Sequence, residues 1–358
     1  MKTLIGIHHD QVRHRNGELQ SFSERWIHLA EQNGIATKLL HGRDAALLDE
    51  IPGCSAFMWR FAFSPYEIES ARRIIQAVEH GVNIPVFPSM KTMWHFEDKI
   101  SQYYILKLSG FPIPETHVFW DEDAAVNFCK STVYPFVVKL KAGIQSQNVA
   151  LIDSRQRALK IVEQLFHSGV NSTEELFNKG EVSVRKPVSA LRCIIKNSLG
   201  TRRLLPVRLL LGRPFPEGLQ SGYLYAQEYL PDNEFDTRIT IIGNRGFAFR
   251  RYNRPEDFRA SGSGLIDWNP EHIDTQSLKL AFKLAKHLGT QSLAVDILQK
   301  ENRPVIAEIS YTYASWAVRD CPGHWIPASD DYAGELVYKS GKMRPEDAIF
   351  EDFMTLLH

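Results

Sequence analysis

The amino-acid sequence predicts an α/β domain followed by α+β units. Short apolar runs alternate with helical patterns through the first 90 residues, which is typical of a small parallel sheet. From residue 97 onward, the predicted strands and helices lose that regular alternation. The chain has 358 residues. Because a domain usually holds roughly 100–200 residues, we expect two or three structural units.

Composition excludes several classes of protein. Hydrophobic residues make up 44% and charged residues 23% of the chain, so disorder, collagen and coiled coil do not describe the whole. Lys plus Arg and Asp plus Glu both number 42. No net charge therefore attracts a membrane surface or nucleic acid, and we expect no nucleic-acid partner.

Cysteine spacing and the N-terminus indicate the cellular compartment. The four cysteines lie 75, 64 and 128 residues apart, which fits neither a metal knuckle nor a disulfide framework and indicates a reducing environment. The first apolar run is interrupted by His8 and His9, too early for a signal peptide. No stretch is as long as the roughly 18 apolar residues that a membrane helix needs. We therefore expect a cytoplasmic protein without a membrane span.

The first 90 residues hold the elements of the parallel sheet. Phe22, Trp26 and Ala30 recur at helical spacing, and Gly34 ends that helix. No Gly-x-Gly-x-x-Gly occurs in this part, so nothing here favours a dinucleotide. The expected elements are strands at 3–7, 36–40, 55–61 and 84–87 and helices at 21–33 and 65–80.

The rest of the chain predicts an α+β organisation. Gly110 ends one helix, Pro231 ends one strand, and a glycine-rich loop occupies 259–266. The expected strands lie at 116–120, 135–140, 148–152, 223–229, 236–243 and 246–252, the expected helices at 97–109, 122–131, 154–168, 274–288 and 345–357, and a hairpin at 293–310.

Two acidic residues lie inside the apolar strands of the predicted hairpin, Asp296 in the first and Glu308 in the second. If residues 301–303 form a three-residue loop, the numbers of paired residues sum to 604 and Asp296 lies directly opposite Glu308. Directly opposed Cβ atoms are about 4.5–5.5 Å apart. The two carboxylates therefore need a positive charge between them.

A divalent cation meets this need, because Mg²⁺ takes one or two protein carboxylates and completes its shell with water and phosphate oxygens. Ser310 lies two residues after Glu308, on the same face, and offers a third oxygen. An amphipathic hairpin with both acids facing solvent fits the spacing equally well. Other residues must decide between the two interpretations.

Further polar residues end other predicted strands. Lys139 ends a β-forming run before a small polar segment at 142–149, which suits a phosphate ligand, although a solvated lysine is the alternative. The strand at 225–230 stops at a proline and leaves backbone groups for the edge of a heterocycle. Arginine binds phosphate oxygens bidentately, and it recurs near the predicted hairpin at positions 238, 250, 251 and 259.

Together these residues resemble the ATP-grasp superfamily, and most nearly its ribosomal-protein glutamate-ligase branch. The resemblance covers residues 85–315, and it is carried by Lys139, Gln227, Glu228, Tyr229, Leu230, Asp236, Arg238, Arg250, Arg251, Phe258, Arg259, Asp296 and Glu308 in this order. The run at 258–264 also resembles ATP-grasp proteins of bacterial surface-polysaccharide gene clusters. The resemblance implies an ATP-grasp fold with an N-terminal Rossmann-like pre-ATP-grasp domain.

A division of the chain follows from the resemblance. We expect a pre-ATP-grasp α/β domain at 1–95, an ATP-grasp N-terminal lobe at 96–178, a basic insertion at 179–222 and a C-terminal lobe at 223–358 with the metal hairpin and a terminal helix. Residues 179–213 carry nine Lys or Arg side chains against Glu181 alone. The insertion is either a solvated surface or a docking site for a polyanionic substrate.

The resemblance also assigns roles to single residues. It implies ATP and Mg²⁺ as cofactors. The implied ATP ligands are Lys99, Lys139, Gln227, Glu228, Tyr229, Leu230, Asp236, Arg238, Arg259 and Ser261, the implied catalytic residues are Arg250, Arg251 and Arg259, and the implied metal ligands are Asp296, Glu308 and Ser310. Serine stands at 261 and 310 where the family has asparagine, and the usually glycine-rich loop after Lys139 contains only Gly143.

The implied activity is the ATP-dependent joining of a carboxylate to an amine through an acyl phosphate. The substrates are small-molecule or carrier-linked carboxylates and amines of unknown identity. Two alternatives stay open, a small-molecule kinase on the same scaffold and a degenerate nucleotide-binding protein without catalysis. The two serines at asparagine positions favour the degenerate protein.

Overall fold

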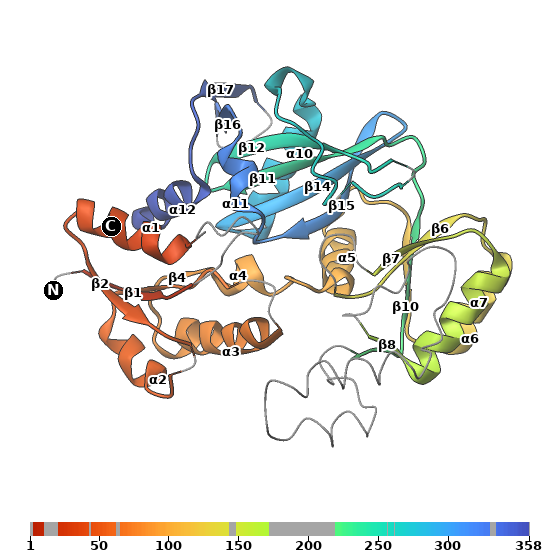
Figure 1. The fold of residues 1–358 in the computed structure, drawn as a ribbon, viewed down its shortest axis with the longest axis horizontal. Helices are drawn as coiled ribbons and strands as arrows, with labels where there is room; N and C mark the ends of the chain where they lie inside the picture. The colour runs from red at the N-terminus through yellow and green to blue at the C-terminus, as the bar shows by residue number, and fades with distance from the viewer. Residues whose placement is uncertain are drawn as a thin grey trace, which may run out of the picture. The chain divides into compact units, whose positions relative to one another are not determined.

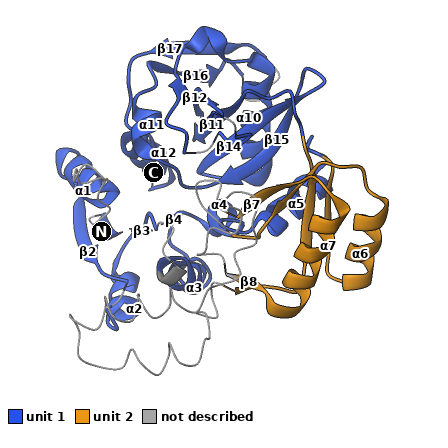
Figure 2. Ribbon diagram, turned by 45° about the vertical axis from the view of Figure 1, so that its right-hand side comes forward, with its two compact units in different colours: residues 1–114, 230–358 blue, residues 115–229 orange. Residues whose placement is uncertain are grey.

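A computed structural model describes residues 3–10, 21–42, 44–61, 65–142, 148–171, 219–255, 257–260, 262–329 and 334–357. The chain divides into two compact units, one formed by Met1–Pro114 with Leu230–His358 and the other by Glu115–Tyr229 (Figure 2). The expected boundaries after residues 95, 178 and 222 divide the chain differently and remain a prediction. The basic segment at 179–213 and loop residues 143–147 lie outside the described residues.

The first sheet belongs to the larger unit and is entirely parallel, with the strand order β2-β1-β3-β4. Its elements alternate along the chain as predicted (Figure 1). They are β1 (Leu4–His8), α1 (Phe22–Gln32), β2 (Ala36–Leu40), α2 (Leu47–Glu50), β3 (Ala56–Met58), α3 (Pro65–Gly81) and β4 (Val86–Phe87), followed by the single turn α4 (Met90–Met93). The predicted Rossmann-like sheet is confirmed.

Alternate residues of β1 and β3 point to opposite faces of this sheet and fill two cores. On one face Ile7 and Met58 pack with Trp26 of α1. On the other face Phe57 packs with Ile75 of α3. Burial on both faces explains why the strands contain continuous apolar runs.

The second unit is a four-stranded antiparallel sheet in the order β5-β10-β6-β7. Helices α6 and α7 lie side by side and share one apolar core with the sheet (Figure 1). Asp121 begins α6 by accepting a hydrogen bond from the backbone N–H of Ala124 at 2.8 Å. The elements are β5 (Thr116–Phe119), α6 (Glu122–Ser131), β6 (Phe136–Lys139), β7 (Val149–Ile152), α7 (Arg155–Glu163) and β10 (Leu224–Glu228), with a short pair of β8 (Val170–Asn171) and β9 (Leu219–Gln220).

A seven-stranded sheet completes the larger unit, with the order β15-β14-β11-β12-β16-β17 and β13 paired to β12. One of its faces packs on α10, whose buried residues include Leu278 and Phe282. The elements are β11 (Phe235–Ile242), β12 (Arg245–Tyr252), β13 (Ile266–Asp267), α10 (Thr275–Leu288), β14 (Ser292–Lys300), β15 (Arg303–Ser310), α11 (Ser315–Arg319), β16 (Gly323–Pro327), β17 (Leu336–Ser340) and α12 (Pro345–Met354). The sequence analysis did not predict β16 and β17.

The hairpin of β14 and β15 has the predicted opposition of acids but a different turn. The three-residue loop at 301–303 is wrong, because the strands end at Lys300 and Arg303 and the turn is Glu301-Asn302, both with positive φ. This turn alone would shift every pair by one residue. A β-bulge between Ile297↔Ile306 and Asp296↔Glu308 takes up the extra residue. Asp296 therefore lies opposite Glu308.

No helix in the described part of the chain is both long enough and apolar enough to cross a bilayer.

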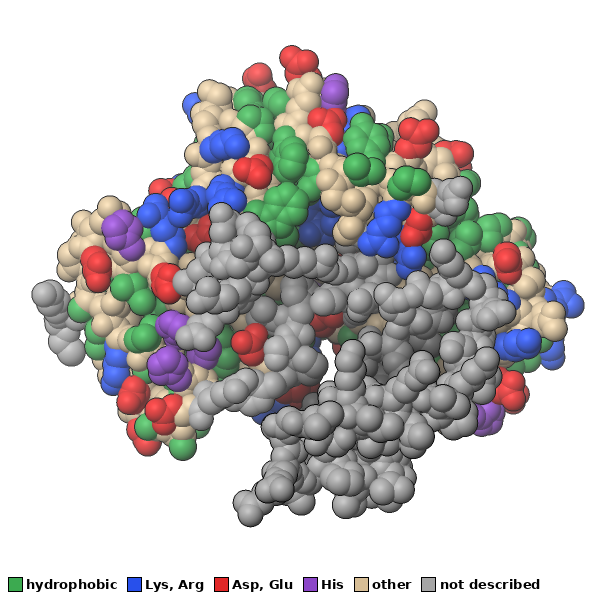
Figure 3. Space-filling view, viewed as in Figure 1, with side chains coloured by type: hydrophobic (Ala, Val, Ile, Leu, Met, Phe, Trp, Pro, Cys, Tyr) green, Lys and Arg blue, Asp and Glu red, His purple; other side chains and the backbone are tan. Residues whose placement is uncertain are grey.

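On the face drawn in Figure 3, acidic and basic side chains are interspersed. This mixture agrees with the equal numbers of acidic and basic residues in the sequence.

A buried histidine precedes α5 (Lys99–Leu108). His95 is 0% exposed, and neither of its ring nitrogens has a hydrogen-bond partner among the described residues. Burial lowers the pKa of His95 to about 4. The imidazole is therefore neutral in the folded chain at pH values where it is protonated in the unfolded chain.

Acidification from pH 7 to pH 5 is expected to destabilise the chain through His95. The unfolded state binds this proton below its ordinary pKa of 6.5, whereas the folded state does not bind it until about pH 4. Stability is therefore lost as the pH falls through this window, by about 2 kcal/mol at pH 5. Urea unfolding of His95→Phe should show a smaller loss than the parent chain.

The matched control is His28→Phe on the exposed side of α1, which should leave the pH dependence unchanged. An equal loss of stability in the parent chain and in His95→Phe would contradict the assignment.

Candidate functional site

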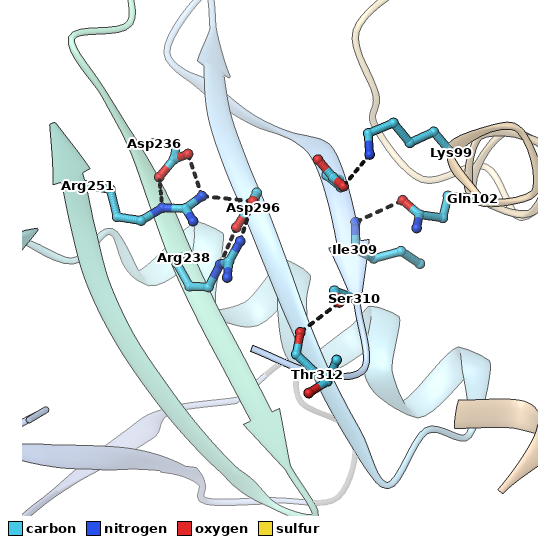
Figure 4. A network of polar contacts seen from close by, with 10 residues as sticks. Lys99, Gln102, Asp236, Arg238, Arg251, Asp296, Ile309, Ser310 and Thr312 are labelled. Atoms are coloured by element: carbon cyan, nitrogen blue, oxygen red, sulfur yellow. Dashed lines mark hydrogen bonds and ion pairs between the residues drawn. The ribbon is translucent and has the colours of Figure 1, made fainter. Parts of the chain in front are cut away.

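Charged side chains form a continuous row across four strands of the seven-stranded sheet. Asp236 of β11 pairs in register with Arg251 of β12, and Arg238 of β11 pairs with Asp296 of β14. Asp296 pairs in turn with Glu308 of β15. Lys99 of α5 joins at the end of the row (Figure 4). We call these six residues the charge cluster.

Asp296 is the most heavily bonded member of the charge cluster. Its Oδ1 accepts a hydrogen bond from Arg238 Nε at 2.5 Å, and its Oδ2 accepts one from Arg238 Nη2 at 2.7 Å. Arg251 Nη2 lies 2.8 Å from the same Oδ2. Burial by itself would raise the pKa of Asp296, but the two guanidinium groups outweigh it and hold the pKa far below its usual value. Asp296 is therefore an anion.

Arg251 connects this carboxylate to a second one. Its Nε and Nη2 donate to Asp236 Oδ1 and Oδ2 at 2.7 and 2.6 Å, so the guanidinium bridges Asp236 and Asp296. Burial would lower the pKa of Arg251, and the two carboxylates raise it well above its usual value. For Asp236, burial prevails over Arg251 and raises the pKa. The side chains of Arg251, Asp236 and Asp296 that form this bridge are 10–13% exposed.

Lys99 balances Glu308 at the other end of the row. Its Nζ lies 2.9 Å from Glu308 Oε1, and the lysine side chain is 5% exposed. Burial would lower the pKa of Lys99, but Glu308, followed by Glu97, raises it. Asp98 begins α5 by accepting a hydrogen bond from Ser101 N–H at 3.0 Å, which sets Lys99 at the first helical position.

A residue that sequence reasoning missed also fixes α5 to the hairpin. Gln102 Oε1 accepts a hydrogen bond from the backbone N–H of Ile309 at 3.3 Å, and Gln102 Nε2 donates to the backbone carbonyl of His95 at 3.0 Å (Figure 4). Lys99 and Gln102 are three residues apart and share one helix face. That spacing is the sequence signal that predicts a second contact with the hairpin.

The charge cluster is electrically balanced. Three carboxylates (Asp236, Asp296 and Glu308) face three cations (Arg238, Arg251 and Lys99), so the sum is 3 − 3 = 0. In this structure the positive charge that the facing acids require comes from side chains. Buried ions stay stable only when each one is paired and hydrogen-bonded.

The donor set fits Mg²⁺ in one particular way. Asp296 and Glu308 place hard carboxylate oxygens on neighbouring strands, and in this structure those oxygens are bonded to Arg238, Arg251 and Lys99. Ser310 Oγ donates to the Thr312 carbonyl at 2.7 Å, which leaves its lone pairs available. The described residues contain no group of three or more His, Cys, Asp or Glu that could hold a metal by itself. The set therefore suits an ion that receives its remaining ligands from water or phosphate oxygens.

Four of the predicted nucleotide ligands lie in the second unit. Lys139 ends β6 opposite Val149. Glu228 Oε2 accepts a hydrogen bond from Glu115 N–H at 3.0 Å. Gln227 Nε2 donates to Thr116 Oγ1 at 3.0 Å, so its side chain is committed to the neighbouring strand. Tyr229 is the last residue of this unit, and Leu230 is the first residue after it.

Arg250 and Arg259 also lie outside the charge cluster. Arg250 alternates with Arg251 on β12 and points to the other face, where its guanidinium lies 4.2 Å from the ring centroid of Phe235. Arg259 pairs with Asp257 at 2.7 Å. Ser261 lies outside the described residues. The catalytic roles of Arg250 and Arg259 remain predictions.

Removing one member of the charge cluster is expected to lower the free energy of unfolding more than removing an oppositely charged pair. Arg238→Met leaves three carboxylates against two cations and should destabilise the chain by about 3–5 kcal/mol. Arg238→Met combined with Asp296→Leu restores the balance and should recover most of that loss. Urea unfolding of the single and double variants measures the coupling.

Arg245→Met is the control, because Arg245 pairs with a half-exposed Glu351 at 2.6 Å and should cost at most about 1 kcal/mol. Losses that simply add in the double variant would show that the cluster is not held by charge balance.

The chain is similar in fold to several solved structures. The chain superimposes on a RimK domain ATP-grasp protein of Sphaerobacter thermophilus with a TM-score of 0.51 and 18% identity, covering 89% of this chain and 96% of that one. For D-alanine–D-alanine ligase of Bacillus anthracis complexed with ATP, the TM-score is 0.54 at 13% identity, with 100% and 98% covered. For the macrocyclase MdnC of Microcystis aeruginosa bound with precursor peptide MdnA, it is 0.54 at 14% identity, with 99% and 100% covered.

No protein-family model matches the chain. Identities this low establish the fold alone. With its parallel N-terminal sheet, its second antiparallel unit and its carboxylate hairpin, this chain has the ATP-grasp fold.

Proposed function

We propose that this protein is an ATP-dependent carboxylate–amine ligase that forms an amide bond through an acyl phosphate. The observation that supports this function best is the charge cluster. It brings the carboxylates of Asp296 and Glu308, the proposed metal ligands, together with three cationic side chains. A magnesium–nucleotide complex brings both a cation and anionic phosphates, which matches both halves of the cluster.

The cationic side chains act on the transferred phosphoryl group. A carboxylate oxygen of the substrate attacks the γ-phosphorus, the bond to the bridging oxygen breaks, and ADP leaves. Arg238, Arg251 and Lys99 offset the negative charge that spreads over the phosphoryl oxygens. These side chains are fixed by their carboxylate partners before the nucleotide binds, so little reorganisation is needed.

The second step needs no nucleophile from the protein. The substrate amine attacks the acyl carbon, phosphate leaves with the bonding electron pair, and the amine proton passes to solvent. Magnesium, when bound with the nucleotide, supplies charge neutralisation at the phosphate oxygens. Its proposed ligands are Asp296, Glu308 and Ser310.

Other residues of the proposed nucleotide site follow from the resemblance. Lys139 is proposed as a phosphate ligand, Glu228 and Tyr229 as adenine contacts, and Arg250, Arg259 and Ser261 as further residues around the phosphates. Gln227, Leu230 and Asp236 complete the proposed ATP ligands. Their assignment rests on the motif order in the sequence.

The substrates are proposed as small-molecule or carrier-linked. This range is supported by similar folds in a ligase named for D-alanine and in a macrocyclase named with its precursor peptide. A cytoplasmic location is proposed from the cysteine spacing. A polyanionic substrate at 179–213 is proposed from the nine basic side chains there.

ADP release should require both a carboxylate and an amine. A screen of carboxylates and amines, read out by coupled ADP detection, should find pairs that release ADP only when both are present. Asp296→Ala should lower the rate at least about 100-fold, because it removes a proposed metal ligand and leaves Arg238 unpaired. Release with a carboxylate alone and a stable phosphorylated product would favour a kinase.

Magnesium and ATP should bind together and not separately. Magnesium alone adds two positive charges to a balanced cluster, whereas the magnesium–ATP complex also brings phosphates to Arg238, Arg251 and Lys99. Calorimetry should therefore show at least about tenfold tighter uptake of magnesium when ATP is present, which is about 1.4 kcal/mol of coupling.

Glu308→Gln should reduce this coupling while ATP alone still binds, because Lys99 keeps its charge. Equal magnesium affinity with and without ATP would contradict the proposed role of the cluster.

A further inference from the structure

Arg60 is a buried cation away from the charge cluster. It lies two residues beyond the end of β3 and is 8% exposed. Its Nη2 donates to the backbone carbonyl of Tyr313 at 3.1 Å, and its guanidinium carbon lies 4.8 Å from the ring centroid of Phe22. These contacts fix the guanidinium plane but supply no negative charge.

No carboxylate of the described residues lies within ion-pair distance of Arg60. Its Nε is buried and has no hydrogen-bond partner in the described part of the chain. A buried guanidinium without a counter-ion is unfavourable, and buried charges in proteins are normally paired. Among the described residues, the Arg60 guanidinium therefore has no counter-ion.

Two acids are connected to the surroundings of Arg60, Asp10 through Phe22 and Glu346 through its electrostatic interaction with the guanidinium. Asp10 Oδ2 accepts the N–H of Phe22 at 3.0 Å, and Asp10 Oδ1 accepts the Ser23 hydroxyl at 2.8 Å, so this carboxylate caps α1. Glu346 lies in the electrostatic field of Arg60, but burial raises the pKa of Glu346 and opposes its ionisation. Neither acid forms an ion pair with Arg60.

Arg60 lies at an edge of the parallel sheet that suits ligand binding. The chain places β2 and β3 on opposite sides of β1, and open α/β sheets bind ligands beyond the carboxyl ends of the strands at such a switch point. Histidines follow the neighbouring strands at this edge, with the rings of His9 and His41 5.6 Å apart. Figure 3 shows a group of histidine side chains at the surface.

Arg60 is also tied to the segment that follows the carboxylate hairpin. Its partner Tyr313 lies three residues after Ser310, and the Tyr311 hydroxyl donates to the backbone carbonyl of Phe61. Both bonds join the carboxyl edge of the first sheet to the chain just beyond the proposed magnesium ligands.

We propose that Arg60 anchors an anionic group, a carboxylate or a phosphate, of the acceptor substrate at the carboxyl edge of the first sheet. The identification of the ligand as a substrate rests on the proposed ligase function. The anion site itself does not depend on it.

Thermal unfolding with added anions tests the site. Succinate and inorganic phosphate are compared with sodium chloride at equal ionic strength, in the parent chain, Arg60→Met and Arg60→Lys. We expect at least one anion to raise the Tm of the parent chain, because a ligand that binds only the folded state stabilises it. Arg60→Met should lose this shift, and Arg60→Lys should keep part of it, since lysine retains the charge but not the bidentate geometry.

Several outcomes separate the possibilities. A larger shift with succinate identifies a carboxylate ligand, and a larger shift with phosphate identifies a phosphate ligand. Arg245→Met is the control and should keep the full shift, because Arg245 forms a surface pair with Glu351. An equal shift in the parent chain and in Arg60→Met, or no shift with either anion, would overturn the proposal.

ATP affinity of the same variants keeps this test apart from the proposed function. Arg60→Met should bind ATP with magnesium within about twofold of the parent chain, because Arg60 is outside the charge cluster. If the parent chain binds no ATP while its anion shift depends on Arg60, the ligase function fails and the anion site stands. Arg60→Met is expected to fold, since it removes an unpaired buried charge. If Arg60→Met does not fold, the anion-dependent Tm shift of Arg60→Lys tests the proposal instead.

Discussion

The carboxylate of Asp296 between two guanidinium groups is the constraint on which the seven-stranded sheet depends. Both of its oxygens are bonded, to Arg238 and to Arg251. A buried anion of this kind is tolerated only when its partners are in place. The strands that supply the partners must therefore stay in register, and a slip of one residue would turn every one of these side chains to the opposite face.

The hairpin shows how that register is kept. A two-residue turn at Glu301-Asn302 and a β-bulge beside Asp296 each shift the pairing, and together they leave Asp296 opposite Glu308. Helix α5 then holds the outer strand in place through Lys99 and Gln102. The bulge fixes how β15 pairs with β14, and α5 contacts β15 directly. Both therefore determine the position of Glu308. A site for a highly charged ligand benefits from such fixed geometry, because the side chains need not be reordered when it binds.

Much of this arrangement follows from sequence periodicity. Apolar runs and helix-ending glycines locate most strands and helices, and the summed register places Asp296 opposite Glu308. The turn was missed because two positive-φ residues, neither of them glycine, give no strong turn signal. β16 and β17 were missed because their burial is partial and irregular, without clean alternation. The partners of Asp296 could not be predicted, because they come from strands about 50 residues away whose register a single sequence does not reveal.

Two buried arginines of the larger unit, Arg251 and Arg60, differ in whether an acidic side chain pairs with them. Arg251 is bonded to Asp236 and Asp296, and its charge is fully matched within the protein. Arg60 is buried to a similar degree, yet within the described chain its one bonded partner is a neutral carbonyl. Packing alone does not explain the difference, because an uncharged side chain of the same length would fill the space beside Phe22 at lower cost. The proposed anionic ligand would explain both the burial of Arg60 and the absence of a counter-ion among the described residues.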